Sequence, residues 1–204
     1  MLNILSQWQQ PLLWLCTAVE VLLAAPGFLA SLLPKVASHA LAQTVCAQAY
    51  PSLARLAPQL RATPLTITGV ALVACGCALR LICYKKLGPL FTFDLTIFPS
   101  HTLVTSGPYG VVRHPAYTGT LFMCSGILLV NFTPGSWITE CGVLGTGMTG
   151  VAIRAIVACL WYGWWLSVGV YRCRSEDAEL RKTFGKEWDA YAAKVRWWFV
   201  PYVM

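Results

Sequence analysis

The chain has 204 residues, of which 57% are hydrophobic and only 11% charged, and its formal net charge is +7. A soluble domain usually carries about 25% charged residues, so the composition excludes an ordinary soluble enzyme and is typical of an integral membrane protein. The basic residues adjoin apolar segments, where they set topology and contact anionic lipids, so no nucleic-acid partner is expected. We predict an all-α fold, a polytopic membrane helix bundle of about four to five spans.

Four apolar segments follow one another along the chain and are long enough to cross a bilayer, which takes about 20 residues. Their ranges are 11–33, 62–79, 116–139 and 141–171. Glu20 and Arg154 are charges inside these segments. A carboxylate in a span is costly and often functional. The alternatives for Glu20 are a proton-relay or substrate group, a neutral group, or a partner of Arg154 or of a backbone group inside the bundle.

The basic clusters of the second half share one side of the membrane if four spans are present. They lie at 80–86, at Arg113 and at 172–196, and the positive-inside rule makes their side cytosolic. We divide the chain into residues 1–86, with the N-terminal membrane helices and their loop, and residues 87–204, the functional core. A cytosolic helical segment at the C-terminus is expected to complete that core.

Two features of the sequence point away from common cofactor and metal sites. The nine cysteines include no CxxC pair and lie mostly in apolar runs, where Cys behaves as a small hydrophobe, so neither a metal site nor a disulfide framework is predicted. Residues 145–150 read GTGMTG and match GxGxxG. That pattern binds dinucleotides only after a strand, whereas here it joins two apolar segments.

A polar connection over residues 87–115 leads into GPYGVVRHPAYTG, residues 107–119. The Gly-Pro pair indicates a turn, and Pro115 suits the first turn of a helix, so Arg113 and His114 are expected at the mouth of the third span. Helix N-termini attract anions, and these two side chains add charge-assisted donors. The pattern favours a pocket for a carboxylate or phosphate. The alternative is a snorkelling arginine beside a capping histidine.

The stretch SEDAELRKTFGKEWDAYAAKV, residues 175–195, predicts a helix with one apolar face. That face consists of Leu180, Phe184, Trp188, Tyr191 and Val195. Glu176 lies one turn earlier on the same face and must find a cation or a donor, whereas Asp177 is expected to point elsewhere. The alternative for Glu176 is a surface pair with Arg172 or Arg174. Gly185 costs the helix roughly 1 kcal/mol, so a bend or break is expected there.

These motifs, with LRLICYKKLGPLFTF before them, resemble the isoprenylcysteine carboxyl methyltransferase family, which is related to the phospholipid N-methyltransferases. The resemblance covers roughly residues 79–201. It implies an endoplasmic-reticulum membrane enzyme that binds S-adenosylmethionine at the cytosolic end of its helices. The matching cofactor positions are His101, Leu103, Val104, Gly107, Tyr109, Arg113, His114, Pro115, Tyr117, Gly119 and Glu176. The family's Glu-Glu pair is Glu176-Asp177 here, and its closing Val-Pro is Val195-Arg196.

The resemblance implies methyl transfer to the C-terminal carboxylate of a prenylated cysteine. Arg113 and His114, with local N–H groups, would hold the cofactor's carboxylate, while Glu176 would pair with a cationic part. Arg172 or Arg174 would steer the acceptor. A carboxylate is already ionised near pH 7 and needs no general base, whereas a protonated amine does.

The two tyrosines of the motif, Tyr109 and Tyr117, would wall the adenosine or face the sulfonium, because an aromatic ring attracts a cation. The first alternative function is a phospholipid N-methyltransferase with a lipid substrate. The second is a non-catalytic membrane protein of the same fold. The sequence does not indicate an oligomeric state.

Overall fold

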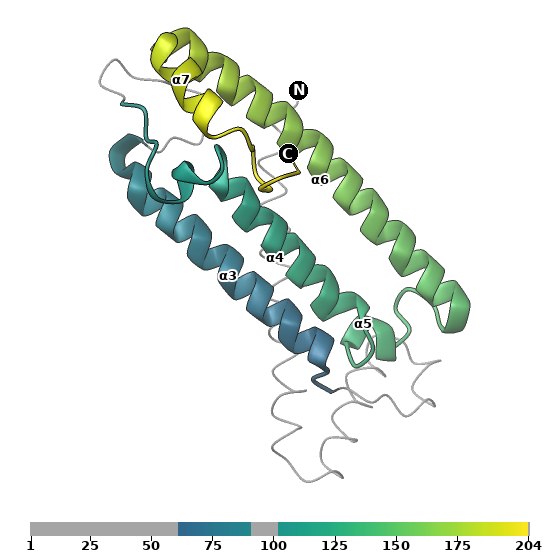
Figure 1. The fold of residues 1–204 in the computed structure, drawn as a ribbon. Coiled ribbons are helices and arrows are strands. Elements are labelled where there is room, and N and C mark those ends of the chain that lie inside the picture. Colours follow the sequence, from purple (N-terminus) through teal and green to yellow (C-terminus); the bar gives the residue numbers. More distant parts are fainter. Residues whose placement is uncertain (1–60, 91–101, 204) are drawn as a thin grey trace. The chain divides into compact units, whose positions relative to one another are not determined.

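The structure, a computed structural model, describes residues 61–90 and 102–203, and within them every regular element is a helix (Figure 1). The elements are α3 (Pro64–Leu87), η1 (Gly88–Leu90), η2 (Gly107–Gly110), α4 (Pro115–Phe132), α5 (Trp137–Glu140), α6 (Gly147–Phe184) and α7 (Lys186–Lys194). The all-α prediction is therefore confirmed for the described part of the chain.

Three of these helices, α3, α4 and α6, are long and apolar enough to cross a membrane. They have 24, 18 and 38 residues, and at about 1.5 Å per residue even the shortest approaches the thickness of a hydrocarbon core. This finding supports a membrane protein. The predicted span 11–33, with Glu20, lies outside the described residues, so the total number of spans stays a prediction.

The helix boundaries differ from the expected ones at three places. α3 continues past Arg80 to Leu87, so this arginine lies inside a helix and does not end it. α4 ends at Phe132, because Pro134 and Gly135, with φ of 92°, form a turn before α5. α6 begins within the GTGMTG run, whose first two glycines have positive φ, and continues unbroken beyond the apolar segment.

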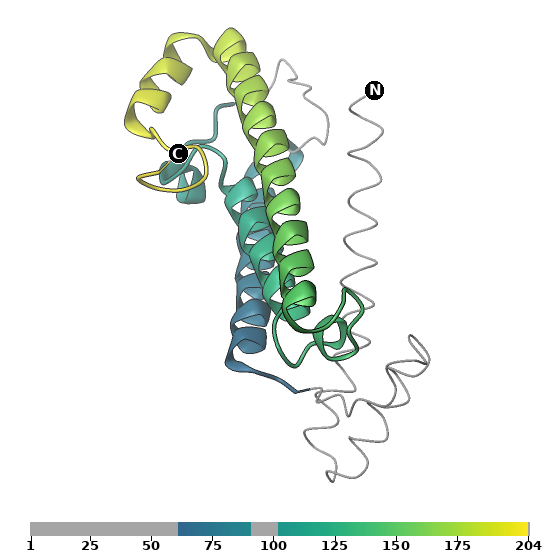
Figure 2. The ribbon, with the colours of Figure 1, turned by 90° about the vertical axis from the view of Figure 1, so that its right-hand side faces the viewer.

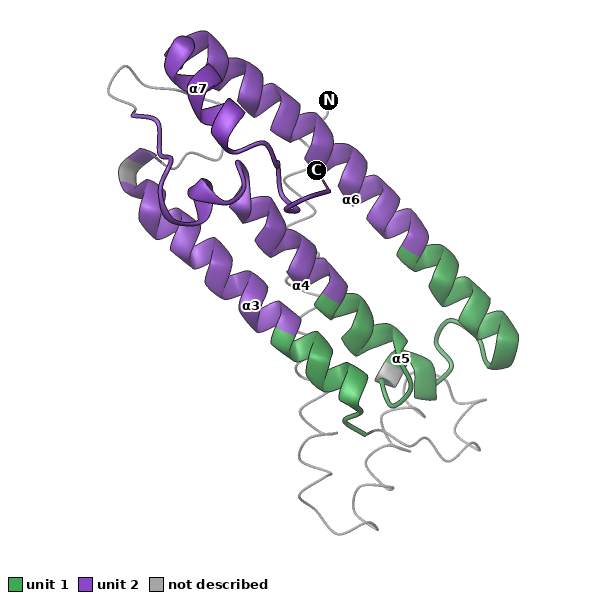
Figure 3. Ribbon diagram, viewed as in Figure 1, with its two compact units in different colours: residues 1–71, 126–158 green, residues 72–125, 159–204 purple. Residues whose placement is uncertain are grey.

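Two compact units make up the chain, and they are coloured separately in Figure 3. The described part of unit 1 comprises residues 61–71 and 126–158. Its helices approach at Gly69, where an added Cβ would lie 2.8 Å from the carbonyl oxygen of Gly126. Cys141, also in this unit, is buried and disulfide-bonded, which the sequence did not indicate. The six other described cysteines are free thiols.

Unit 2 comprises residues 72–125 and 159–204 and holds most of the predicted site. α3 and α4 approach closely here as well, since a Cβ on Gly76 would lie 2.5 Å from the carbonyl oxygen of Gly119. α4 and α6 are joined by a hydrogen bond between the hydroxyls of Ser125 and Tyr162. Gly185 has φ of 51° and separates α6 from α7, which confirms the predicted break. The chain after α7 returns beside the start of α4 (Figures 1 and 2).

Candidate functional site

The returning C-terminal segment is bound to the Arg-His-Pro motif through its backbone. The hydrogen bonds run from Arg113 N–H to Trp197 O (2.8 Å), from His114 N–H to Trp198 O (2.7 Å) and from Thr118 Oγ1 to Phe199 O (2.6 Å). They define the path of the last residues, which the Val195-Arg196 departure from the family pattern left open. They also occupy two backbone N–H groups that were expected to bind an anion.

His114 is buried between two carboxylates of α6. Its Nε2 lies 2.9 Å from Asp177 Oδ1 and its Nδ1 lies 3.2 Å from Glu176 Oε2. Burial acts to lower the pKa of His114, but hydrogen bonds to the two carboxylates and their negative charges outweigh it, and the pKa is raised. A ring with a carboxylate at each nitrogen is held as the imidazolium, with both nitrogens donating.

Asp177 is the most heavily engaged group of the cluster. Besides His114, it accepts a hydrogen bond of 2.9 Å from Trp198 Nε1 and lies 3.3 Å from Arg113 Nη1. The expectation that Asp177 points away from the buried face is wrong. Because α7 turns back at Gly185, the buried face of α6 follows Cys173 and Asp177, which are four residues apart and both buried.

Glu176 is the more open of the two carboxylates, with 30% of its side chain exposed. It accepts a hydrogen bond of 2.7 Å from the hydroxyl of Tyr117, in the first turn of α4. The prediction that Glu176 must find a donor or a cation is therefore confirmed, and its partners are Tyr117 and His114. The cluster brings both sequence motifs together and balances two cations, Arg113 and His114, against two anions.

Two buried N–H groups beside this cluster have no hydrogen-bond partner among the described residues. They are Arg113 Nε and Trp188 Nε1. The Arg113 guanidinium carbon lies over two indole rings, 5.7 Å from the centroid of Trp188 and 5.8 Å from that of Trp198. Sequence reasoning did not select either tryptophan as a site residue. A buried, unpartnered donor normally has an acceptor that completes it.

Tyr109, the buried residue of η2, connects the site to α7. Its carbonyl oxygen accepts a hydrogen bond of 2.8 Å from the hydroxyl of Tyr191. The pKa of Tyr109 is raised, first by burial and then by Cys83, Glu176 and Tyr191. Burial also raises the pKa of Tyr191 to about 12, with Arg113 opposing and Asp177 adding to the shift. Both phenols are therefore neutral at physiological pH.

The other predicted residues have less defined surroundings. Gly107 adopts φ of 67°, which favours glycine, and Pro115 is fully buried at the start of α4. Leu103 and Val104 are half-buried before η2, whereas His101 lies outside the described residues. Of the two arginines expected to steer an acceptor, Arg172 is half-buried. Arg174 is exposed and lies 5.7 Å from the centroid of Trp198.

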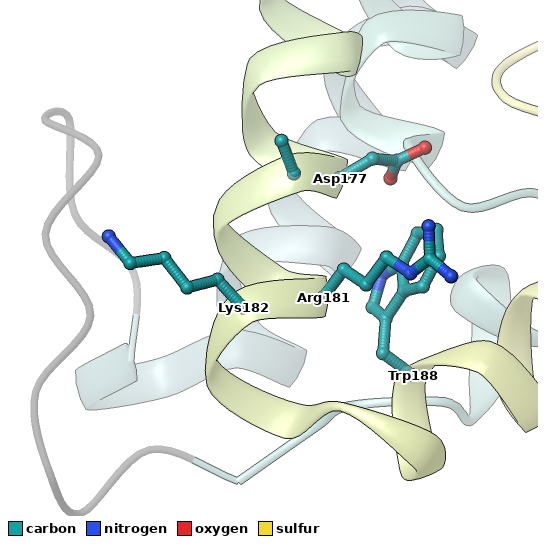
Figure 4. A pocket seen from close by; sticks show the side chains of 5 residues that line it. Asp177, Arg181, Lys182 and Trp188 are labelled. Carbon is teal, nitrogen blue, oxygen red and sulfur yellow. The ribbon is translucent and has the colours of Figure 1, made fainter.

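A hollow of about 470 Å³ adjoins the cluster between α6 and α7 and is lined by Asp177, Ala178, Arg181, Lys182 and Trp188 (Figure 4). Arg181 extends beside the Trp188 ring, whereas Lys182 points away from it. Arg181 pairs with Asp189 at 2.9 Å, and Lys182 pairs with Glu179 at 3.6 Å. These are exposed surface pairs, which contribute little to stability and are easily exchanged.

The fold and the cluster define a helical membrane protein with a charged site at the mouth of one long helix. Residues 69–143 match the sequence model of the isoprenylcysteine carboxyl methyltransferase (ICMT) family. The chain is therefore similar to that family over these residues. The matched region covers η2, the Arg-His-Pro motif and α4.

Two kinds of relative carry the family's name. The chain is 33% identical over 98 residues to a protein-S-isoprenylcysteine O-methyltransferase of Xenopus laevis, which covers 43% of this chain and 32% of that protein. It is 28% identical over 129 residues to probable protein-S-isoprenylcysteine O-methyltransferases of Oryza sativa, subspecies indica and japonica, covering 62% of this chain and 56% of theirs. The chain thus matches between a third and just over half the length of these relatives.

Proposed function

We propose that this protein transfers a methyl group from S-adenosylmethionine to the C-terminal carboxylate of a prenylated cysteine, at the membrane surface. The observation that carries the proposal is the joining of the two motifs. His114, from the motif before α4, lies between Glu176 and Asp177 of α6. The similarity of residues 69–143 to the ICMT family supports the same reaction. The methyltransferase core is proposed to be residues 87–204.

The residues of the site fit a zwitterionic cofactor. Glu176 is open enough to meet a cationic group, and the unpartnered N–H groups of Arg113 and Trp188 can donate to an acceptor oxygen. The remaining walls would be His101, Leu103, Val104, Gly107, Tyr109, His114, Pro115 and Tyr117. When bound, S-adenosylmethionine supplies an electrophilic methyl group on a sulfonium. The chain's residues orient the reactants and exclude water.

The state of His114 favours a carboxylate acceptor over an amine. Held as an imidazolium between two carboxylates, it has no free lone pair with which to take a proton. The buried phenol of Tyr109 stays neutral as well. An ionised carboxylate attacks without a base, whereas the amine of a phospholipid needs one. Arg172 and Arg174 would guide the incoming carboxylate at the rim of the site.

We place the protein in the endoplasmic-reticulum membrane, with its site facing the cytosol. The basic clusters support this orientation by the positive-inside rule.

One assay tests this function against both alternatives. The purified full chain is given radiolabelled S-adenosylmethionine with either N-acetyl-S-farnesylcysteine or phosphatidylethanolamine, and the products are treated with alkali. We expect label on the farnesylcysteine that alkali releases as methanol, because only an ester hydrolyses in this way. Alkali-stable label on the lipid would establish the N-methyltransferase instead. Absence of transfer and of cofactor binding by calorimetry would indicate a non-catalytic protein.

The residue roles are tested by separate kinetic constants. Arg113→Ala or Glu176→Ala should raise the KM for S-adenosylmethionine sharply, and unchanged cofactor kinetics in both variants would remove the assignment. Arg172→Gln should instead raise the KM for the acceptor and leave the cofactor KM unchanged. The two classes of variant therefore distinguish the donor site from the acceptor rim.

A further inference from the structure

Arg80 is a charged residue within α3, about two turns before the helix ends. Its guanidinium points toward α4, where Nη1 donates to Thr120 Oγ1 and, at 3.4 Å, to the carbonyl oxygen of Ala116. Nη2 donates to the hydroxyl of Tyr84 on its own helix. All of these partners are neutral oxygens. No carboxylate among the described residues forms an ion pair with Arg80.

The close approach of α3 and α4 makes room for this side chain. A Cβ on Gly119 would lie 2.7 Å from Arg80 Cγ and 3.5 Å from Cδ, so the aliphatic stem passes directly over the glycine. The stem thereby delivers the guanidinium to the turn of α4 that spans Ala116 to Thr120. Tyr117 belongs to the same turn and donates to Glu176. Arg80 therefore lies at the level of the charged cluster along α4.

The charge of Arg80 calls for an anion that the described residues do not supply. Arg80 is half-buried, and its neutral partners satisfy N–H donors without neutralising its charge. An ionisable group within a span is a functional candidate by default. The cluster around His114 has no anion to spare, because its two carboxylates already face two cations. The missing anion is therefore best sought in a ligand.

We propose that Arg80 binds the carboxylate of the methyl acceptor, on the side of α4 that faces α3. This inference rests on the function proposed above and assigns the acceptor's anion to a named residue. The carboxylate is the anionic group of a prenylated cysteine, and a planar guanidinium matches it with two parallel hydrogen bonds. Arg172 and Arg174 then act at the rim during approach, and Arg80 holds the bound acceptor.

The test compares N-acetyl-S-farnesylcysteine with its carboxamide, which has the same shape but no charge and serves as a competitive inhibitor. In Arg80→Gln, we expect the KM for the carboxylate to rise about tenfold or more, because the loss of a charge-assisted hydrogen bond weakens binding by roughly this factor. The inhibition constant of the carboxamide and the KM for S-adenosylmethionine should stay unchanged. Arg80→Lys keeps the charge but loses the paired N–H groups of the guanidinium. Its KM for the carboxylate should therefore lie between those of the wild type and Arg80→Gln.

Arg154→Gln is the matched control, because it removes an arginine from the apolar part of α6 that is not a hydrogen-bond partner of Arg80. Calorimetric binding of S-adenosylhomocysteine reports whether each variant is folded. If Arg80→Gln does not fold, the same two constants, the KM for the carboxylate and the inhibition constant of the carboxamide, are compared between the wild type and Arg80→Lys. A wild type that binds the carboxamide as tightly as the carboxylate overturns the inference.

Three further outcomes overturn the inference in distinguishable ways. Equal weakening of carboxylate and carboxamide by Arg80→Gln indicates a structural role, while methyl transfer by the wild type still supports the proposed function. Loss of co-purified anionic phospholipid in Arg80→Gln, with the preference for carboxylate intact, identifies a lipid phosphate as the partner. Failure of the wild type both to methylate and to bind farnesylcysteine removes the proposed function and this inference together.

Discussion

The two units hold their helices together in different ways. In unit 1, close backbone contact at a small residue joins the helices, with Gly69 against Gly126 and Val130. In unit 2, α3 and α4 make a similar close contact. In addition, a charged cluster links α4, α6 and the returning C-terminal segment. The first arrangement leaves no room for an added atom, and the second requires that each charge keep its partner.

This difference separates stability from chemistry. Glycine contacts bring helices close without placing any reactive group between them, so changes there should affect folding alone. The cluster combines a fully engaged carboxylate, Asp177, with a more open one, Glu176. Changes in the cluster should affect both folding and ligand binding, in proportions that depend on which carboxylate is removed.

The largest effect is expected for Asp177→Ala. Removing Asp177 leaves Arg113 without a carboxylate and His114 with Glu176 alone, and breaking a buried charge network in this way typically costs about 3–5 kcal/mol. The free energy of unfolding in detergent should fall by about this amount. Glu176→Ala, at the more open position, should cost distinctly less stability but weaken S-adenosylhomocysteine binding. Asp177→Asn, which keeps the size of the side chain and removes its charge, is the matched control for the lost volume. Equal losses of stability at positions 176 and 177 would contradict the contrast between the two carboxylates.

A smaller effect is expected for Gly69→Ala in unit 1. Its Cβ would lie 2.8 Å from both the Gly126 oxygen and Val130 Cγ2, so the helices must separate, and overpacking of this kind costs about 1–3 kcal/mol. The unfolding temperature should fall, while calorimetric affinity for S-adenosylhomocysteine stays unchanged. Gly163→Ala on α6 meets nothing within 4 Å and is the control. If Gly69→Ala lost as much affinity for S-adenosylhomocysteine as Glu176→Ala, the glycine contact would affect ligand binding as well as folding, against the contrast between the two units.

Much of this arrangement could be predicted from local sequence signals. Apolar runs located the three described spans, and Pro115 correctly placed Arg113 and His114 at the mouth of α4. The helix break at Gly185 followed from the low helix propensity of glycine. The need of Glu176 for a partner followed from its position near an apolar stripe. Each of these features depends on residues within a few positions of one another.

What could not be predicted depends on how the chain returns on itself. The apolar stripe was read as one helix face across Gly185, and this reading wrongly left Asp177 outside the buried face. Trp198 contacts Asp177 and Arg113 because the segment after α7 pairs with the backbone before α4. No local pattern encodes that pairing. A signal was nevertheless present in the adjacent acidic residues, since either one can face the core when the register is unknown.

The smallest expected effect is the pH dependence of the stability that His114 provides. Because its pKa is raised in the folded state, the contribution of the imidazolium is fully present below the unfolded value of about 6.5. It is lost as the pH rises through the folded pKa. The difference in unfolding temperature between the wild type and His114→Gln should therefore be largest in mild acid and shrink in alkali. Lys182→Gln, which removes an exposed charge, should show no such trend. A difference that grows with rising pH would mean that folding favours the neutral ring, and the cluster would then be held by neutral hydrogen bonds instead of by charge.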